Sequence, residues 1–223
     1  MLFYAITDRR SFPGSEEERR GALAALVREW VRGGVDYIQI REKDLAPGEL
    51  LKLARQVIAA AREEAGRGET RDIGAGTRVL LNGPAEMALE VGADGVHLTG
   101  KAAPDAAAAV QAAYDRAGGG RTGRRAILSR SCHTVEEAGR AGADSLVLFG
   151  PVFEKPLAGA EALSGRGLEA LGEACRAGSG AVLALGGVTA ANAHRCIEAG
   201  ASGVAGIRLF LGEEWRRLRD SGL

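Results

Sequence analysis

Residues 34–40, Gly-Val-Asp-Tyr-Ile-Gln-Ile, contain the pattern that decides the fold: a glycine, a small residue and an acid lead into a short apolar run. The same pattern begins again at Gly92, Gly142 and Gly200, with serine in place of the acid in the last case. The successive spacings between these glycines are 58, 50 and 58 residues. A glycine enters the left-handed conformation that commonly ends helices at lower cost than other residues. The pattern therefore predicts four places where a helix ends and a strand begins.

Outward from these entries, strands and helices alternate along the whole chain. Short runs rich in Val, Ile and Leu, apolar on both faces, are typical of buried parallel strands. They lie at 2–7, 35–40, 78–82, 94–98, 125–130, 144–149, 180–186 and 202–207. Helix-like segments lie near 16–32, 47–65, 84–91, 104–117, 135–141, 167–177, 190–199 and 212–219. Eight alternations predict an α/β protein with a (β/α)8 TIM barrel, with an open doubly wound sheet as the alternative. No change of composition marks a boundary, so we expect one domain over residues 1–223.

Composition excludes several classes of protein. The 223 residues carry no net charge, which argues against nucleic-acid and membrane-surface partners. No apolar run approaches the roughly 18 residues of a membrane span, and the start of the chain lacks the features of a signal peptide. The three cysteines are scattered, which suits a reducing compartment. We therefore expect a cytoplasmic protein, and the sequence leaves open whether it forms a homo-oligomer.

Polar and cationic residues gather where the predicted strands end, which is where TIM barrels hold their active sites. The excess of cations indicates an anionic ligand. The candidates for binding such a ligand are Gln39, Arg41, Lys43, Asn82, Arg130 and Ser131; the resemblance described below implies that the anion is a carboxylate or a diphosphate.

The last two strands predict a phosphate site. Gly186, Gly187, Gly206 and Ile207 offer backbone N–H groups after these strands, and Arg208 could add charged donors. The alternative is that these residues form tight turns with a surface arginine.

His133, just past the fifth strand, is the candidate for acid–base catalysis, because histidine exchanges protons near neutral pH. The alternative is a histidine that caps a helix. Its neighbour Cys132 is not favoured as a nucleophile. The sequence predicts no metal site: only Asp8 and Glu42 are acids at strand ends, and Glu42 is expected to orient Arg41 or Lys43.

Eight segments together give the chain a resemblance to the thiamine phosphate synthase/TenI superfamily along nearly its full length. They are YAITD (4–8), DYIQIREK (36–43), VLLNGPAEMAL (79–89), GADGVHL (92–98), HTVEEA (133–138), FGPVF (149–153), LGGVTAAN (185–192) and GASGVAGI (200–207). The resemblance implies a (β/α)8 barrel that works in thiamine biosynthesis.

The superfamily has two activities, and this chain departs from one of them. The synthase joins a pyrimidine diphosphate to a thiazole phosphate with Mg²⁺, and residues 39–43 and Asn82 match its diphosphate-binding residues. However, Gly83 stands where the synthase has a metal-binding Asp, and residues 99–102 lack its second metal-binding acid. The loop from Glu154 matches the synthase only in part.

The other branch, the thiazole tautomerase TenI, matches more closely at Arg130-Ser131-x-His133, at residues 152–154 and at Gly165-Arg166-Gly167. The resemblance implies that His133 moves a proton within a thiazole carboxylate phosphate, with Gly165 joining the phosphate site. We therefore expect a tautomerase that acts on a small phosphorylated thiazole without a cofactor. The alternatives are the synthase, with Mg²⁺, and a non-catalytic barrel that binds a phosphate ligand.

Overall fold

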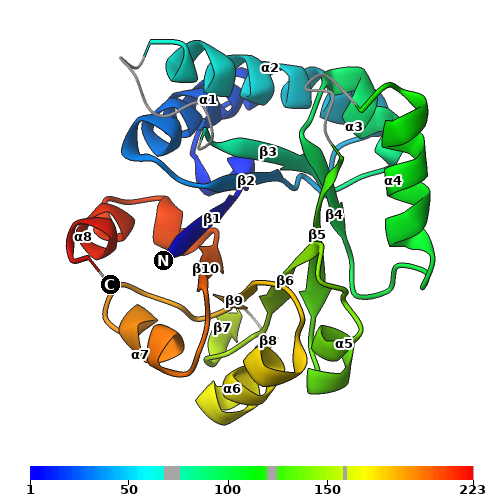
Figure 1. Cartoon of the computed structure of the whole chain (residues 1–223). Coiled ribbons are helices and arrows are strands. Elements are labelled where there is room, and N and C mark those ends of the chain that lie inside the picture. Colours follow the sequence, from blue (N-terminus) through cyan, green and yellow to red (C-terminus); the bar gives the residue numbers. More distant parts are fainter. Residues whose placement is uncertain (68–75, 120–124, 158–159, 223) are drawn as a thin grey trace. The chain divides into compact units, whose positions relative to one another are not determined.

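A computed structural model describes residues 1–67, 76–119, 125–157 and 160–222, with the side chains of 155–163 left out. Eight parallel strands close into a barrel in the order β1-β10-β9-β6-β5-β4-β3-β2 (Figure 1). This confirms the predicted (β/α)8 barrel. The strands are β1 (Leu2–Ile6), β2 (Tyr37–Ile40), β3 (Arg78–Leu81), β4 (Gly95–Leu98), β5 (Ile127–Cys132), β6 (Ser145–Phe149), β9 (Val182–Leu185) and β10 (Gly203–Gly206).

The helices match the predicted segments to within a few residues. They are α1 (Glu16–Gly33), α2 (Pro47–Ala65), α3 (Ala85–Val91), α4 (Ala106–Arg116), α5 (Val135–Gly139), α6 (Gly167–Ala177), α7 (Ala193–Glu198) and α8 (Glu214–Asp220). Two short 3₁₀ helices, η1 (Arg9–Ser11) and η3 (Arg208–Phe210), follow β1 and β10. The four glycines of the repeated entry all have positive φ: Gly34 (76°), Gly92 (70°), Gly142 (80°) and Gly200 (103°). The prediction that they end helices is confirmed.

The chain divides into two compact units, which we describe separately. Unit 1 comprises Met1–Tyr4, Leu98–Ala102 and Leu128–Leu223, and unit 2 comprises Ala5–His97 and Ala103–Ile127. The expectation of a single domain over 1–223 stays a prediction.

In unit 2, helices α1 to α4 lie on the outer side of β2, β3 and β4 (Figure 1). Strands β2 and β3 pair in parallel from Tyr37 opposite Arg78 to Ile40 opposite Leu81. Helix α1 begins with a capping box in which Ser15 and Glu18 bond each other's backbone N–H groups. Its apolar stripe, which includes Leu23, Val27 and Trp30, is buried against the rest of unit 2.

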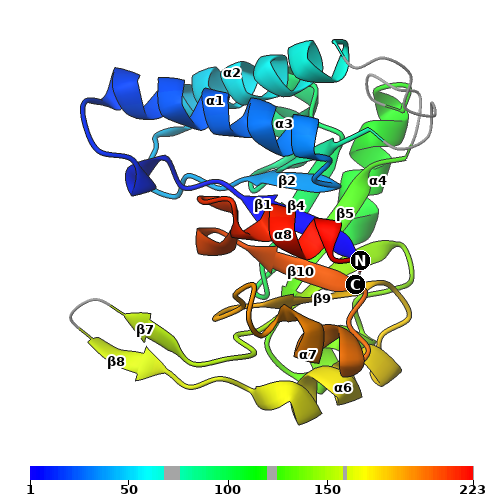
Figure 2. The same cartoon turned by 90° about the vertical axis from the view of Figure 1, so that its left-hand side faces the viewer.

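In unit 1, helices α5 to α8 surround β5, β6, β9 and β10. Phe3 contacts Phe210 and Trp215 edge-on, with ring centroids 6.2 and 6.3 Å apart, and this packing attaches α8 to the start of β1. An antiparallel hairpin of β7 (Lys155–Leu157) and β8 (Ala160–Leu163) extends away from β9 and α6 (Figure 2). The sequence predicted only a long loop there.

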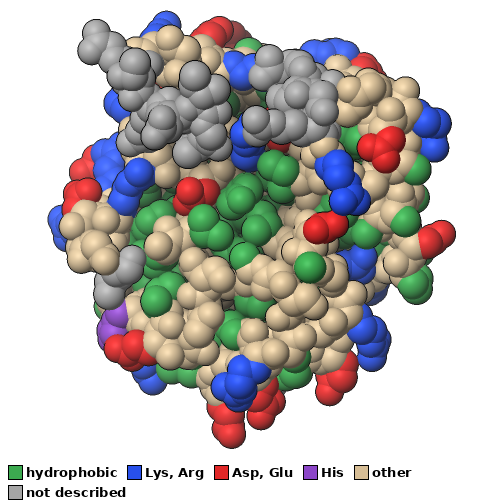
Figure 3. Space-filling model, viewed as in Figure 1, with side chains coloured by type: hydrophobic (Ala, Val, Ile, Leu, Met, Phe, Trp, Pro, Cys, Tyr) green, Lys and Arg blue, Asp and Glu red, His purple; other side chains and the backbone are tan. Residues whose placement is uncertain are grey.

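The outer helices carry charges of both signs, and blue and red side chains are interspersed on the face drawn in Figure 3. This pattern agrees with the absence of net charge in the sequence. Among the described residues, no helix combines the length and the apolar character needed to cross a bilayer.

Candidate functional site

Gln39 is the clearest ligand-binding candidate in unit 2. It lies in β2 between Ile38 and Ile40 and is only 1% exposed. Neither its Oε1 nor its Nε2 has a hydrogen-bond partner. A buried amide without partners costs free energy, and native structures pair nearly all such groups. The Gln39 amide is therefore a candidate to bond a ligand or water.

Arg41 and Lys43 follow β2 directly. The Arg41 backbone N–H donates to Thr7 Oγ1 at 3.0 Å, which fixes the loop to the end of β1. Within the described ranges, no hydrogen bond or ion pair is found for either cationic side chain. The positive charge of Arg41, followed by burial, lowers the pKa of Lys43. Two neighbouring cations without a counter-ion suit an anionic ligand, and their predicted role in binding one stays a prediction.

The acids that alternate with these cations along the loop, Glu42 and Asp44, form ion pairs with Arg9 instead. Arg9, which is 4% exposed, binds both Glu42 and Asp44, with distances of 2.9 Å from Nη1 to Glu42 Oε2 and 2.8 Å from Nη2 to Asp44 Oδ2. Glu42 thus pairs with Arg9, and the expectation that it orients Arg41 or Lys43 directly is wrong. The hydrogen bond from Arg9 lowers the pKa of Asp44 to about 2. No sequence motif links Arg9 to residue 42, so the sequence did not single it out.

Asn82 follows β3 and lies next to the end of β2, because its backbone N–H donates to the Ile40 carbonyl at 2.9 Å. A Cβ built on the next residue, Gly83, would lie 3.3 Å from Leu81 Cδ2. An aspartate at that position would therefore press on Leu81.

His133 follows β5 in unit 1 and is exposed. Its Nδ1 lies 2.6 Å from the Gly150 carbonyl oxygen. A carbonyl only accepts hydrogen bonds, so Nδ1 carries the proton and the neutral ring keeps its lone pair on Nε2. A Cβ built on Gly100 would lie 3.6 Å from that Nε2, so a glycine leaves this edge of the ring open. The geometry suits a proton acceptor. The sequence analysis missed the contacts of Gly100 and Gly150, which join separate loops.

Strand β5 extends two residues beyond its predicted end at Arg130, so Ser131 and Cys132 lie within the strand and not after it. Successive residues of a strand face opposite sides, so Arg130 and Ser131 do not share a face. The Arg130 Nε is buried without a partner. Burial raises the pKa of the Cys132 thiol to about 11, which agrees with the view that it is no nucleophile.

Backbone conformation and close packing account for the glycines at positions 165, 186 and 187. Gly186 and Gly187 have φ values of 89° and 67°, and a Cβ on Gly187 would lie 2.7 Å from Phe153 Cβ. A Cβ on Gly165 would lie 2.5 Å from the Val152 carbonyl oxygen. Close packing thus explains all three glycines, and their role in binding phosphate stays a prediction.

Gly206 ends β10, Ile207 precedes η3, and the exposed Arg208 begins it. No side chain caps η3, so its first N–H groups remain available to a ligand. These three residues are consecutive in one turn of unit 1, and their role in binding phosphate stays a prediction.

A magnesium ion is the group that the synthase alternative implies. In residues 1–67, 76–119, 125–157 and 160–222, no three His, Cys, Asp or Glu side chains gather in a way that could hold a metal ion. Mg²⁺ is bound through carboxylates together with substrate phosphates. The described side chains thus form no metal-binding cluster of their own, and in the synthase alternative Mg²⁺ would be held chiefly by the substrate phosphates.

Comparison with known proteins decides the family. The family model described as thiamine monophosphate synthase (TMP-TENI) matches residues 3–210. The chain belongs to the thiamine monophosphate synthase family. A protein of Geobacter sulfurreducens named putative thiamine-phosphate synthase is 35% identical over 99% of this chain and 91% of its own length. A thiamine-phosphate synthase of a Roseiflexus species is 34% identical over 95% of this chain and 78% of its own.

Among solved structures, thiamine phosphate pyrophosphorylase from Pyrococcus furiosus is similar to this family member. It has a TM-score of 0.69 and 27% identity, and the alignment covers 98% of this chain and 94% of that one. The family places the protein in thiamine biosynthesis as an enzyme. The sequence resemblance to the superfamily is thereby confirmed, whereas its assignment to the tautomerase branch gains no support from these relatives.

Proposed function

We propose that the protein is a thiamine-phosphate synthase, which joins a hydroxymethylpyrimidine diphosphate to a thiazole phosphate and releases pyrophosphate. The observation that carries this proposal is the buried, unpartnered amide of Gln39, followed in the chain by the two unpaired cations Arg41 and Lys43. The relatives named thiamine-phosphate synthase support the same choice. We therefore rank the synthase ahead of the tautomerase, which reverses the order predicted from the sequence.

The reaction breaks the bond between the pyrimidine's exocyclic carbon and the diphosphate, and forms a bond from that carbon to the thiazole nitrogen. Negative charge grows on the departing pyrophosphate. Arg41 and Lys43 would stabilise this charge, and Gln39 Nε2 would donate a hydrogen bond to a phosphate oxygen. Because the described acids form no metal-binding cluster of their own, we assign no step to magnesium.

The second substrate also carries a phosphate. We assign its binding to the turns of unit 1 that contain Gly186, Gly187, Gly206, Ile207 and Arg208, together with Gly165, which follows the hairpin. Backbone N–H groups and an arginine suit a phosphate dianion. The proposed partners are thus two small phosphorylated molecules.

A second candidate, the thiazole tautomerase, is favoured by one observation: the hydrogen bond to Gly150 leaves His133 Nε2 as a free acceptor. In that reaction Nε2 would remove the C2 proton of the thiazole and return a proton to the exocyclic carbon. This reaction needs no metal ion, so the absence of a metal-binding cluster among the described residues does not argue against it.

Two assays on the purified protein separate the candidates. In the first, we expect pyrophosphate release only when both phosphorylated precursors are present, and an Arg41→Ala, Lys43→Ala variant should lose it. In the second, the non-aromatic thiazole carboxylate phosphate is supplied and aromatic absorbance is followed. Turnover there, slowed by about 10²-fold or more in His133→Ala, would establish the tautomerase instead. Ligand binding without turnover in either assay would favour the non-catalytic alternative and refute both.

A further inference from the structure

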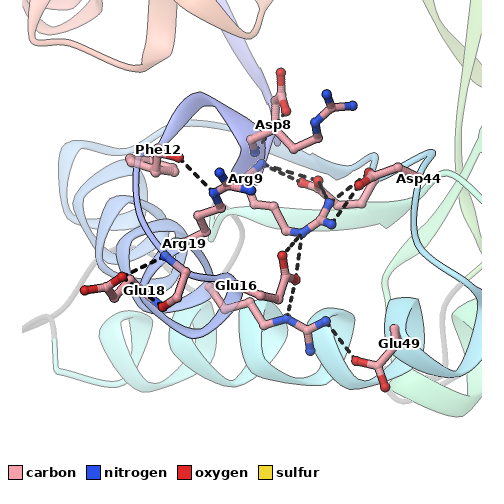
Figure 4. Close-up of polar contacts among 12 residues, drawn as sticks. Asp8, Arg9, Phe12, Glu16, Glu18, Arg19, Asp44 and Glu49 are labelled. Carbon is pink, nitrogen blue, oxygen red and sulfur yellow. Dashed lines mark hydrogen bonds and ion pairs between the residues drawn. The ribbon is translucent and has the colours of Figure 1, made fainter.

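Arg9 is buried and lies at the centre of a partly buried ion-pair network in unit 2. Its guanidinium donates from Nη1 and Nη2 to the two oxygens of Asp44 at 2.9 and 2.8 Å, and from Nε to Glu16 at 2.8 Å (Figure 4). Nη1 also donates to Glu42 at 2.9 Å, and the Arg9 backbone N–H adds a bond to the same carboxylate at 3.1 Å. One arginine thus holds three carboxylates from two segments of the chain: Glu16 of α1, and Glu42 and Asp44 of the loop after β2.

Two of these carboxylates alternate with the anion-binding cations. The order along the loop is Arg41, Glu42, Lys43, Asp44, so each cation has an acid as its neighbour. A mixed loop of this kind could neutralise itself through local ion pairs. Instead both acids bind Arg9, and the described structure shows no ion pair between either acid and Arg41 or Lys43.

We propose that Arg9 is a positioning residue that keeps Glu42 and Asp44 away from Arg41 and Lys43, so that these cations remain free for the diphosphate. The inference rests on the proposed function only for the identity of the anion. Without Arg9, the half-exposed Asp44 can turn to Lys43 and compete with the ligand. The bidentate geometry requires the planar fork of an arginine, which a lysine cannot reproduce.

The test measures the affinity for inorganic pyrophosphate by calorimetry, so that it does not depend on catalysis. We expect Arg9→Met to weaken binding roughly tenfold or more, because a freed carboxylate lies near the ligand. Arg9→Lys, which keeps the charge, should weaken pyrophosphate binding less. This variant replaces Arg9→Met in the test if Arg9→Met does not fold. Adding Asp44→Asn to either variant should restore part of the affinity, since the exposed carboxylate nearest Lys43 is then removed and only the buried Glu42 remains without its partner.

The matched control is Arg20→Met. Arg20 binds Glu16 in the same network but bonds Glu49 and not the acids of the loop, so its removal should leave pyrophosphate affinity unchanged. The proposal is overturned if the Arg9 variants bind as the wild type does, if Asp44→Asn fails to restore binding, or if the wild type binds no pyrophosphate. Pyrophosphate binding that depends on Arg9, in a protein that forms no thiamine phosphate, would instead refute the proposed function and leave the role of Arg9 intact.

Discussion

Gln39 and Glu42 are both buried and lie three residues apart, but only the side chain of Glu42 has hydrogen-bond partners. Glu42 accepts hydrogen bonds from Arg9, whereas the Gln39 amide has none. Burying a polar group without a partner costs free energy, so such a group is expected mainly at functional sites. The sequence identified Gln39, Arg41 and Lys43 as ligand candidates because they follow a strand. It could not identify Arg9, because that pairing depends on two loops meeting in space.

Replacing Gln39 should separate stability from binding. Gln39→Met removes two unpaired polar atoms at similar volume, so we expect the free energy of unfolding to stay unchanged or to rise by about 1 kcal/mol. Pyrophosphate binding should weaken at the same time. Urea unfolding and calorimetry measure the two effects.

Gln111 provides the matched control. It is also a buried glutamine, but its amide bonds the backbone of Ala126 at 2.7 and 3.1 Å. Gln111→Met should therefore lower the free energy of unfolding by about 1–3 kcal/mol. Equal destabilisation by the two substitutions would show that the Gln39 amide has partners in the folded protein.

The buried thiol of Cys132 makes stability depend on pH. Burial raises its pKa to about 11 in the folded protein, above the value expected for an unfolded chain. The folded state thus retains a proton that the unfolded state loses, so stability decreases as the pH rises toward the folded pKa. The expected loss is about 1 kcal/mol between about pH 8 and 10. Urea unfolding across that range should show a shallower loss in Cys132→Ala; an unchanged slope would contradict the raised pKa.

At the scale of elements, the pattern of short apolar runs located all eight barrel strands, because strands buried on both faces are apolar throughout. The hairpin β7–β8 escaped prediction. Its strands, Lys155–Leu157 and Ala160–Leu163, are three and four residues long and contain no β-branched residue. The end of β5 was placed two residues early because Arg130 and Ser131 are polar. Polar residues at the C-terminal end of a barrel strand resemble those of a loop, so the sequence pattern does not show where the strand ends.

The turn after β9 should depend on its glycines. Gly187→Ala places a Cβ 2.7 Å from Phe153 and forces an alanine into a positive φ. We expect a loss of about 2–4 kcal/mol in the free energy of unfolding. The control is Gly48→Ala in α2, where a Cβ would meet nothing within 4 Å. That change should be neutral or stabilise the protein by up to about 1 kcal/mol. Similar effects of the two substitutions would mean that the turn is not as closely packed as described.

At the scale of the whole molecule, the fold was predictable and the choice of reaction was not. Glycines end helices before four of the strands, and apolar strands recur eight times; this regularity specifies a barrel from local patterns alone. The two candidate reactions would share that barrel and the proposed phosphate-binding turns. They differ in a few side chains, such as His133 and the residue at position 83, whose meaning depends on their surroundings in space.

The central claim is that this barrel makes thiamine phosphate, and product analysis tests it most directly. The purified protein is incubated with isotope-labelled hydroxymethylpyrimidine diphosphate and thiazole phosphate, and the products are identified by mass. Our account predicts labelled thiamine phosphate and pyrophosphate in equal amounts, and loss of both in the Arg41→Ala, Lys43→Ala variant. Unreacted precursors after incubation with folded protein that binds pyrophosphate would contradict it.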